Sequence, residues 1–105
     1  MIDIDRKQYL KGFTRKFYQF LKLYPTIKFK KMKNDAGVMR HEYDDSVTIT
    51  LDHREDILPT LIHEFLHWKH PEWSENEVLQ IEKIVSNHLT PQQVKNILKK
   101  LVEIL

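Results

Sequence analysis

Two histidines and a glutamate in the middle of the chain have the spacing of a metal-dependent hydrolytic centre. The segment His63-Glu64-Phe65-Leu66-His67 has the pattern H-E-x-x-H, within a predicted helix from Ile57 to about Lys69. Residues four apart lie on one helical face, so both imidazoles can bind the same zinc ion. Glu64 is expected beside the metal, where a carboxylate can activate a water molecule and carry its proton. These residues predict one Zn²⁺ per chain, with Glu64 as the catalytic residue.

The rest of this predicted helix is consistent with such a centre. Thr60 and His70 fall on the same polar stripe as the two histidines of the motif. Apolar side chains flank the stripe on both sides: Leu58, Leu61, Ile62, Phe65, Leu66 and Trp68. Polar groups on an otherwise apolar helix are costly unless they are engaged. The alternative is a pair of histidines on the surface, or satisfied within the core, with no metal.

The third ligand of the metal is less clear from the residues, although catalytic zinc normally has three. The candidates are Glu75, Glu77, His70 and His88. His70 lies one further turn along the helix of the motif, and ligands at i, i+4 and i+7 do not converge easily on one ion. Glu77 is expected to form a capping box with Ser74, yet a tight helical hairpin would bring it to His67. Helix geometry alone therefore favours Glu77.

A helix and three strands are predicted before the motif. Phe13, Phe17, Phe20 and Tyr24 recur at helical spacing, and Pro25 ends that helix. The clearest strand is Val47–Leu51, in which apolar and polar residues alternate. Predicted turns at 34–37 and 44–45 imply an antiparallel three-stranded meander. If Val47–Leu51 is an edge strand, it can pair an extended peptide beside the metal.

Two further helices are predicted after the motif. Ser74 and Glu77 start one that runs to about His88, and Thr90-Pro91 starts the last. The last helix has a continuous apolar stripe that must dock on something: Val94, Ile97, Leu98, Leu101, Val102 and Leu105. The fold class predicted is α+β, in a single domain over residues 1–105.

Composition excludes several classes of protein. The chain has 105 residues, no cysteine and a formal net charge of +2, which removes disulfides, thiolate catalysis and cysteine-based zinc fingers. The charge is too small to predict a nucleic-acid partner, and the lysines at 28–33 are interpreted as a solvated strand face. No membrane span or signal peptide is evident, so a cytoplasmic protein is expected. The Lys, Glu and Ile content is typical of a thermophile.

The helix–sheet–helix–helix order around H-E-x-x-H resembles the zincin metallopeptidases over essentially the whole chain, and most closely the minigluzincins. That resemblance implies a zincin-like minimal domain with a mostly antiparallel sheet, acting as a zinc peptidase on peptide or protein substrates. It also implies latency, as a zymogen, through the C-terminal segment. Here Pro91–Leu105 is placed to cover the cleft of its own chain or of a neighbour, which makes it a candidate homo-oligomer contact.

The resemblance also bears on the third ligand. The stretch from His63 to Pro71 is similar to another zincin group, in which a histidine ligand follows two residues after the proline, but Trp73 stands there. Glu75 with Val78 fits the general gluzincin pattern, without the acidic residue often found at the fourth position. The minigluzincin resemblance favours a histidine, so His63, His67 and His88 are the predicted metal ligands. Glu75 and Glu77 stay open as alternatives.

Three functions follow from these observations. The first is a latent zinc endopeptidase. The second is a non-catalytic, zinc-stabilised interaction domain, against which the presence of Glu64 argues because a structural site has no need of it. The third is a small nucleic-acid-binding domain that uses the lysines at 28–33, against which the low net charge argues.

Overall fold

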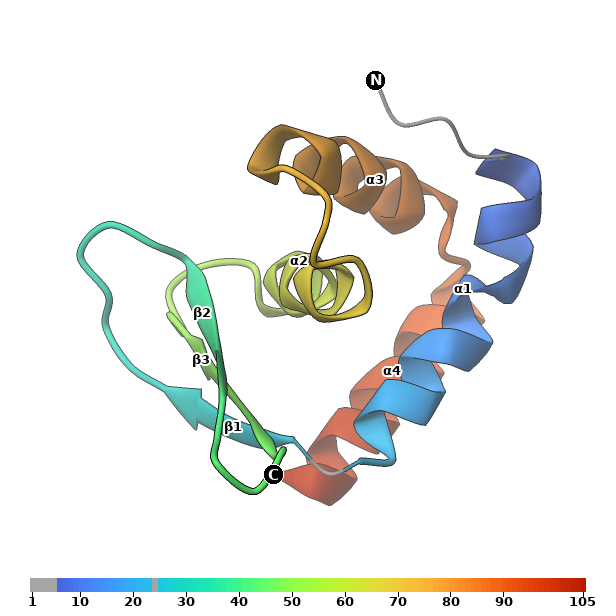
Figure 1. Cartoon of the computed structure of the whole chain (residues 1–105). Helices are drawn as coiled ribbons and strands as arrows, with labels where there is room; N and C mark the ends of the chain where they lie inside the picture. Colours follow the sequence, from blue (N-terminus) through green and yellow to red (C-terminus); the bar gives the residue numbers. More distant parts are fainter. Residues whose placement is uncertain (1–5, 24) are drawn as a thin grey trace.

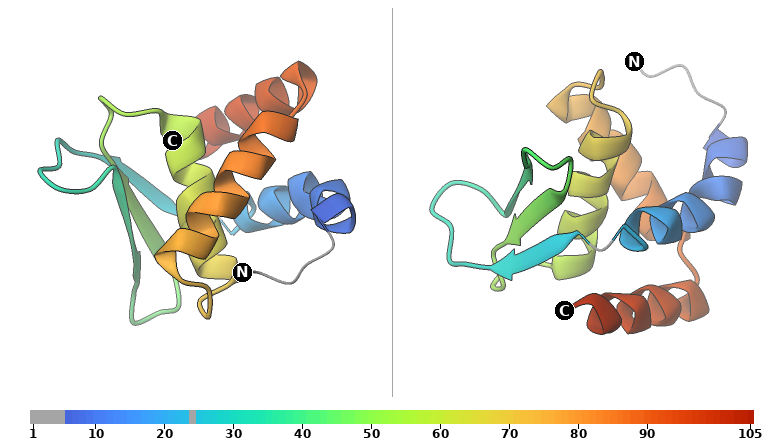
Figure 2. Two further views of the ribbon diagram at one scale, coloured as in Figure 1. Left: turned by 90° about the horizontal axis from the view of Figure 1, so that it is seen from above. Right: turned by 60° about the horizontal axis from the view of Figure 1, so that its bottom comes forward.

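One helix, three strands and three further helices follow one another in a computed structural model that describes residues 6–23 and 25–105. In chain order the described elements are α1 (Arg6–Leu21), β1 (Thr26–Phe29), β2 (Gly37–His41), β3 (Val47–Leu51), α2 (Ile57–Lys69), α3 (Glu75–His88) and α4 (Pro91–Ile104) (Figure 1). This order confirms the predicted α+β class. The helix of the H-E-x-x-H motif, α2, lies at the centre, between the sheet and the other helices (Figures 1 and 2).

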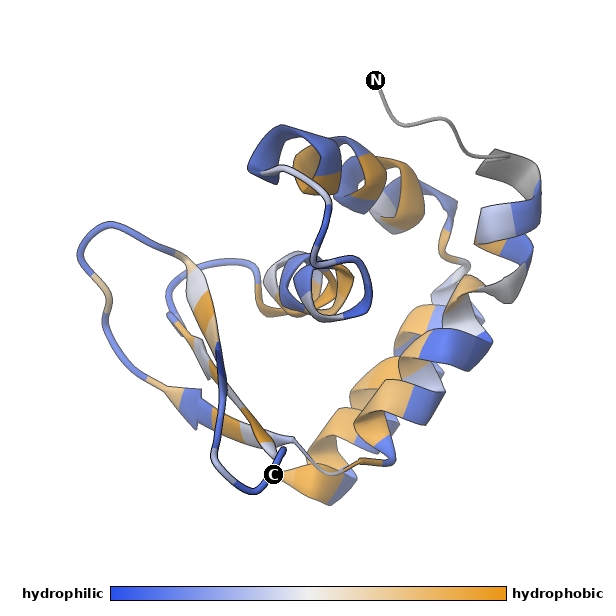
Figure 3. Cartoon of the chain, viewed as in Figure 1, coloured by the Kyte–Doolittle hydropathy of each residue, from blue (hydrophilic) through white to orange (hydrophobic). Residues whose placement is uncertain are grey.

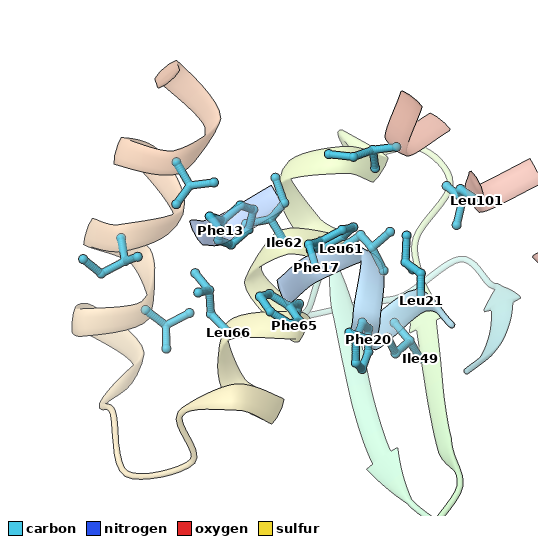
Figure 4. Packing of buried hydrophobic residues seen from close by; sticks show 14 of the residues in the cluster. Phe13, Phe17, Phe20, Leu21, Ile49, Leu61, Ile62, Phe65, Leu66 and Leu101 are labelled. Carbon is cyan, nitrogen blue, oxygen red and sulfur yellow. The ribbon is translucent and has the colours of Figure 1, made fainter. Parts of the chain in front are cut away.

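Aromatic side chains of α1 form the centre of the core. Phe13, Phe17 and Phe20 are buried, as the helical spacing predicts, while Tyr24 lies outside the described residues. All three surround Phe65 of α2, with ring centroids 5.5, 5.0 and 5.3 Å from its own (Figure 4). Phe65 lies on the face of α2 opposite to the motif histidines, because a separation of two residues is about half a helical turn. The apolar face of α2 is thus held in the core, and the face with the motif histidines points away from it.

The predicted antiparallel meander is wrong. The strand order is β1-β3-β2, in which β1 is parallel to β3 and β2 is antiparallel to it. Strand β3, Val47–Leu51, is therefore central and not the edge strand that the sequence suggested; Ile49 and Leu51 are completely buried. Strand β2 contacts the motif helix α2, and β2 is the strand there with a free edge.

The reason for this topology is the connection between β1 and β2. A tight turn at 34–37 would have paired these strands directly, but the backbone from 30 to 36 crosses the end of β3 instead. Asp52, directly after β3, holds the crossing: its buried carboxylate accepts hydrogen bonds from the Met32 and Arg54 amides, 2.9 and 3.0 Å long. The Arg54 guanidinium donates both to Asp52 and to the Met32 carbonyl. The segment predicted as a tight turn is therefore part of a longer loop, which hydrogen bonds to the buried Asp52 hold in place.

The remaining helices complete the scaffold of α2. Helices α2 and α3 form a hairpin, α2 covers one face of the sheet, and α4 packs on α1 (Figures 1 and 2). The capping box predicted at Ser74–Glu77 is present, and α4 starts at Thr90-Pro91 as predicted, where the structure adds a capping box between Thr90 and Gln93. No helix in the described residues is long and apolar enough to cross a membrane.

Candidate metal centre

Three side chains from two helices converge on one point. Nε2 of His63 lies 2.8 Å from one carboxylate oxygen of Glu75, and Nε2 of His67 lies 2.8 Å from the other. The two Nε2 atoms are 3.2 Å apart. Among the described residues, this is the one grouping of three or more potential metal ligands.

The separation of the two histidine nitrogens is compatible with a zinc ion, whereas the two contacts to Glu75 have hydrogen-bond distances. In a tetrahedral site with Zn–N bonds of about 2.0–2.1 Å, two nitrogen ligands lie roughly 3.3 Å apart, close to the separation of the two Nε2 atoms. Two imidazoles and one carboxylate are also a ligand set of catalytic zinc, in which the fourth position stays open to water. His63 and His67 are 13% and 27% exposed, whereas the Glu75 side chain is 65% exposed, so the open side lies toward solvent.

The hairpin between α2 and α3 is what brings Glu75 to the histidines. Helix α3 begins directly after Ser74, whose hydroxyl accepts the Glu77 amide proton, while the Glu77 carboxylate accepts the Ser74 amide proton. These hydrogen bonds lower the pKa of Glu77. The side chain of Glu77 is therefore engaged in the cap, and Glu75, in the first turn of α3, reaches across to α2.

Glu82, one of the residues that the sequence did not single out, supports the first histidine. Its carboxylate lies 3.4 Å from Nδ1 of His63. A proton on Nδ1 facing this carboxylate leaves Nε2 as the lone-pair nitrogen, which is the tautomer that binds a metal. The signal in the sequence is the spacing of Glu75 and Glu82, seven residues apart and so on one face of α3.

Glu64 lies in the wall of the same site without joining the ligand group. Its side chain is 6% exposed, and burial raises the pKa of its carboxyl group. Together with His63, His67, Glu75 and Glu82, it lines a cleft of about 600 Å³. A buried carboxylate beside the histidines is placed to hold or move a proton at the open side of the site.

The opposite wall of the cleft comes from β2 and the loop before it. Gly37 and Met39 of β2 line the cleft, together with Asp35 of the preceding loop and Thr60 of α2. A Cβ atom on Gly37 would lie 2.8 Å from Cγ2 of Thr60 and 3.3 Å from the Thr50 carbonyl oxygen. Glycine at position 37 thus allows the edge strand to approach α2 closely, next to the histidines.

His88, the predicted third ligand, and His70, another candidate, both lie outside the ligand group. His88 is exposed at the end of α3, where its Nδ1 is 2.8 Å from the carbonyl oxygen of Ile84, and it is not part of the group around His63. His70 is the C-terminal cap residue of α2, stacked on Trp73 with ring centroids 3.7 Å apart and hydrogen-bonded to the Tyr9 hydroxyl. Burial lowers the pKa of His70. This histidine joins α1 to the α2–α3 turn.

The C-terminal helix does not approach the cleft within this chain. Ile97 and Leu101 of α4 are buried in the core, and no residue of α4 lines the cleft. The segment that was expected to cover the cleft therefore packs on α1 (Figure 1). In this arrangement, covering the cleft would require the α4 of a second chain.

Comparisons with protein-family models, with curated proteins and with solved structures find no match to this chain.

Proposed function

We propose that this chain is a zinc-dependent peptidase in which His63, His67 and Glu75 hold the metal and Glu64 is the general base. The observation that carries the proposal is the position of Glu64, buried in the cleft wall beside the ligand group but outside it. A zinc ion that only stabilised the fold would be closed by four protein ligands and would have no use for an adjacent carboxylate. The resemblance to the zincin metallopeptidases supports the same chemistry, although the third ligand proposed is Glu75 and not the histidine that the minigluzincin resemblance favoured.

The side chains of the cleft divide the chemistry between them. When bound, zinc supplies a Lewis acid that acidifies water and polarises a carbonyl group. Glu64 accepts the proton of the attacking water and delivers it to the amine that leaves when the peptide bond breaks. Glu82 keeps His63 in the metal-binding tautomer through Nδ1. The free edge of β2 pairs with an extended substrate and holds its backbone along the cleft.

The test compares metal content and hydrolysis in three variants. Glu64→Gln should keep one zinc per chain and lose hydrolysis of an unfolded protein substrate. Glu75→Ala should lose zinc and activity together, whereas His88→Ala should lose neither. Zinc retained by the wild type with no hydrolysis of any peptide would instead favour a zinc-stabilised interaction domain. No zinc uptake would remove the proposal altogether.

A further inference from the structure

The face of the sheet that α2 does not cover is strongly basic. Residues alternate between the two faces of a strand, and in the β2–β3 pairing Val38 lies opposite Thr50 while Arg40 lies opposite Thr48. Gly37 and Met39, the alternate residues of β2, line the metal cleft. Strand β2 therefore separates two surfaces, one on each face of the sheet. Within the described chain, no helix covers the outer face (Figure 2).

Two adjoining hollows occupy this outer face. One, of about 390 Å³, has Lys28, Lys30 and Arg40 around the two threonines. The other, of about 490 Å³, has Lys30, Lys31 and Lys33 and continues into the β1–β2 loop. Both include Val38, the first outward residue of β2. We call the surface formed by Lys28, Lys30, Lys31, Lys33 and Arg40 the basic groove; the loop at its end is mostly hydrophilic (Figure 3).

The charges of the basic groove are largely unmatched. All four lysines are exposed, and none of them makes an ion pair with another described residue. Arg40 pairs with Glu42 at 2.9 Å. Protection of an exposed sheet edge against aggregation is a common role of lysine. That role is sufficient to explain Lys28 on β1. It does not account for three lysines of a loop gathered around Val38 on the other edge strand.

The two faces of β2 carry opposite charge. On the cleft side, Glu64, Glu75 and Glu82 are acidic, whereas the basic groove on the outer side is positive. Asp35, in the loop before β2, lines both the cleft and the hollow beside Lys30 and Lys33. An extended peptide paired with the free edge of β2 directs successive side chains to these two faces in turn. Its outward side chains lie beside Val38 and Arg40, at the edge of the basic groove.

We propose that the basic groove selects acidic side chains at alternate positions of the polypeptide that pairs with β2. The substrate class of the cleft is thus an extended segment with Asp or Glu on the outward side and uncharged or basic residues on the inward side. This inference rests on the proposed function, because it assumes that substrate pairs with the free edge of β2. Opposite charge on the two faces makes the selection depend on register, since a shift of one residue puts every acid against the acidic cleft.

The experiment measures peptide binding by the zinc-loaded Glu64→Gln protein, which keeps the cleft but does not cleave. Three fluorescent peptides of equal length are compared by anisotropy. One has Glu and Thr in alternation, one has the same residues in two contiguous blocks, and one has Gln in place of Glu. The alternating peptide should bind about tenfold more tightly than the Gln peptide, the size expected of two or three exposed charge pairs. This preference should weaken as salt rises.

Charge variants locate the selection. Lys30→Glu with Lys33→Glu should abolish the preference for the alternating peptide, and Lys30→Gln with Lys33→Gln should reduce it. The matched control is Lys95→Glu with Lys99→Glu, since both lysines are exposed on α4 and outside the groove. Control variants should bind all three peptides as the parent protein does.

Several results would overturn the inference. The inference fails if the three peptides bind with equal affinity, or if the alternating and block peptides do. It also fails if the preference survives both Lys30/Lys33 variants. A single-stranded oligonucleotide that binds more tightly than the alternating peptide and displaces it would assign the groove to nucleic acid instead. Failure of the proposed function looks different: the wild type then takes up no zinc or hydrolyses nothing. A zinc-loaded wild type that cleaves acidic and neutral peptides equally well defeats only the inference about the groove.

Discussion

Nδ1 of His63 lies 3.4 Å from the Glu82 carboxylate, while Nε2 of the same ring faces Glu75 at 2.8 Å. The imidazole is therefore held between two acids of the same helix, with one nitrogen directed to each. When Nε2 binds a metal, the ring carries its proton on Nδ1, and Glu82 is the carboxylate that faces this proton. A single helix, α3, thus supplies both a ligand and the group that orients another ligand.

This arrangement predicts a measurable role for Glu82 in metal affinity. Glu82→Ala should weaken zinc binding by about 10–100-fold, the usual effect of removing a carboxylate behind a histidine ligand. Glu82→Gln should weaken it less, since the amide oxygen still accepts the Nδ1 proton. Competition with a chromophoric chelator measures both affinities. Lys83→Ala, an exposed neighbour on α3, is the control, and the prediction fails if it matches Glu82→Ala.

A second prediction concerns the close approach of β2 to α2. Gly37→Ala should lower the free energy of unfolding by about 1–3 kcal/mol, because the added methyl group overlaps Cγ2 of Thr60 and the core resists expansion. Thr60→Ser removes that Cγ2 atom, so the Gly37→Ala/Thr60→Ser double variant should recover part of the loss. Urea denaturation of the four proteins of this cycle measures the coupling. Strictly additive effects would show that the two residues are not in conflict.

A third prediction concerns acid stability. Hydrogen bonds from Arg54 and from the Met32 amide hold the pKa of Asp52 well below its usual range. A carboxyl group whose pKa is lower in the folded state stabilises the protein above its unfolded pKa, about 3.9, and this stabilisation is lost as the pH falls. The melting temperature should therefore fall on acidification below about pH 4. Asp52→Asn should melt lower than the wild type at neutral pH and show a smaller decrease on acidification. Parallel thermal melts at several pH values test this, and an unchanged acid slope would contradict it.

A fourth prediction concerns the C-terminal helix. Ile97 is completely buried, whereas the neighbouring Leu98 is 43% exposed. Ile97→Ala should reduce the free energy of unfolding by about 2–5 kcal/mol, as for other large-to-small changes in a core. Leu98→Ala should have little effect, since much of its side chain already contacts water. If α4 were a detachable cover of the cleft, both substitutions would leave stability unchanged and Ile97→Ala would raise activity instead.

The helices were predictable because their signals are local. Ser74 with Glu77 and Thr90 with Gln93 set the starts of α3 and α4 through side-chain caps within four residues of chain. The stripe of Phe13, Phe17 and Phe20 likewise follows from helical spacing alone. Such features need no knowledge of distant segments, and the structure confirms them.

The sheet was less predictable because strand order is a long-range property. Residues 34–37 have the composition of a turn, yet the backbone there continues a loop that crosses the end of β3. The loop is fastened there by the buried carboxylate of Asp52, which accepts a hydrogen bond from the Met32 amide twenty residues away in sequence. Local turn propensity carries no information about that contact. The edge strand next to α2 is consequently β2, and Val47–Leu51 is central.

The sequence alone determined the spacing of His63 and His67 on one helical face and the place of Glu64 between them, because the helical repeat is a local rule. It left the third member of the group among several acids and histidines. Only the tertiary structure decided that Glu75 joins the two histidines while His88 does not. The physical reason is the tightness of the α2–α3 hairpin: the turn after Pro71 is short, and the core packing of both helices brings the start of α3, rather than its end, next to His67.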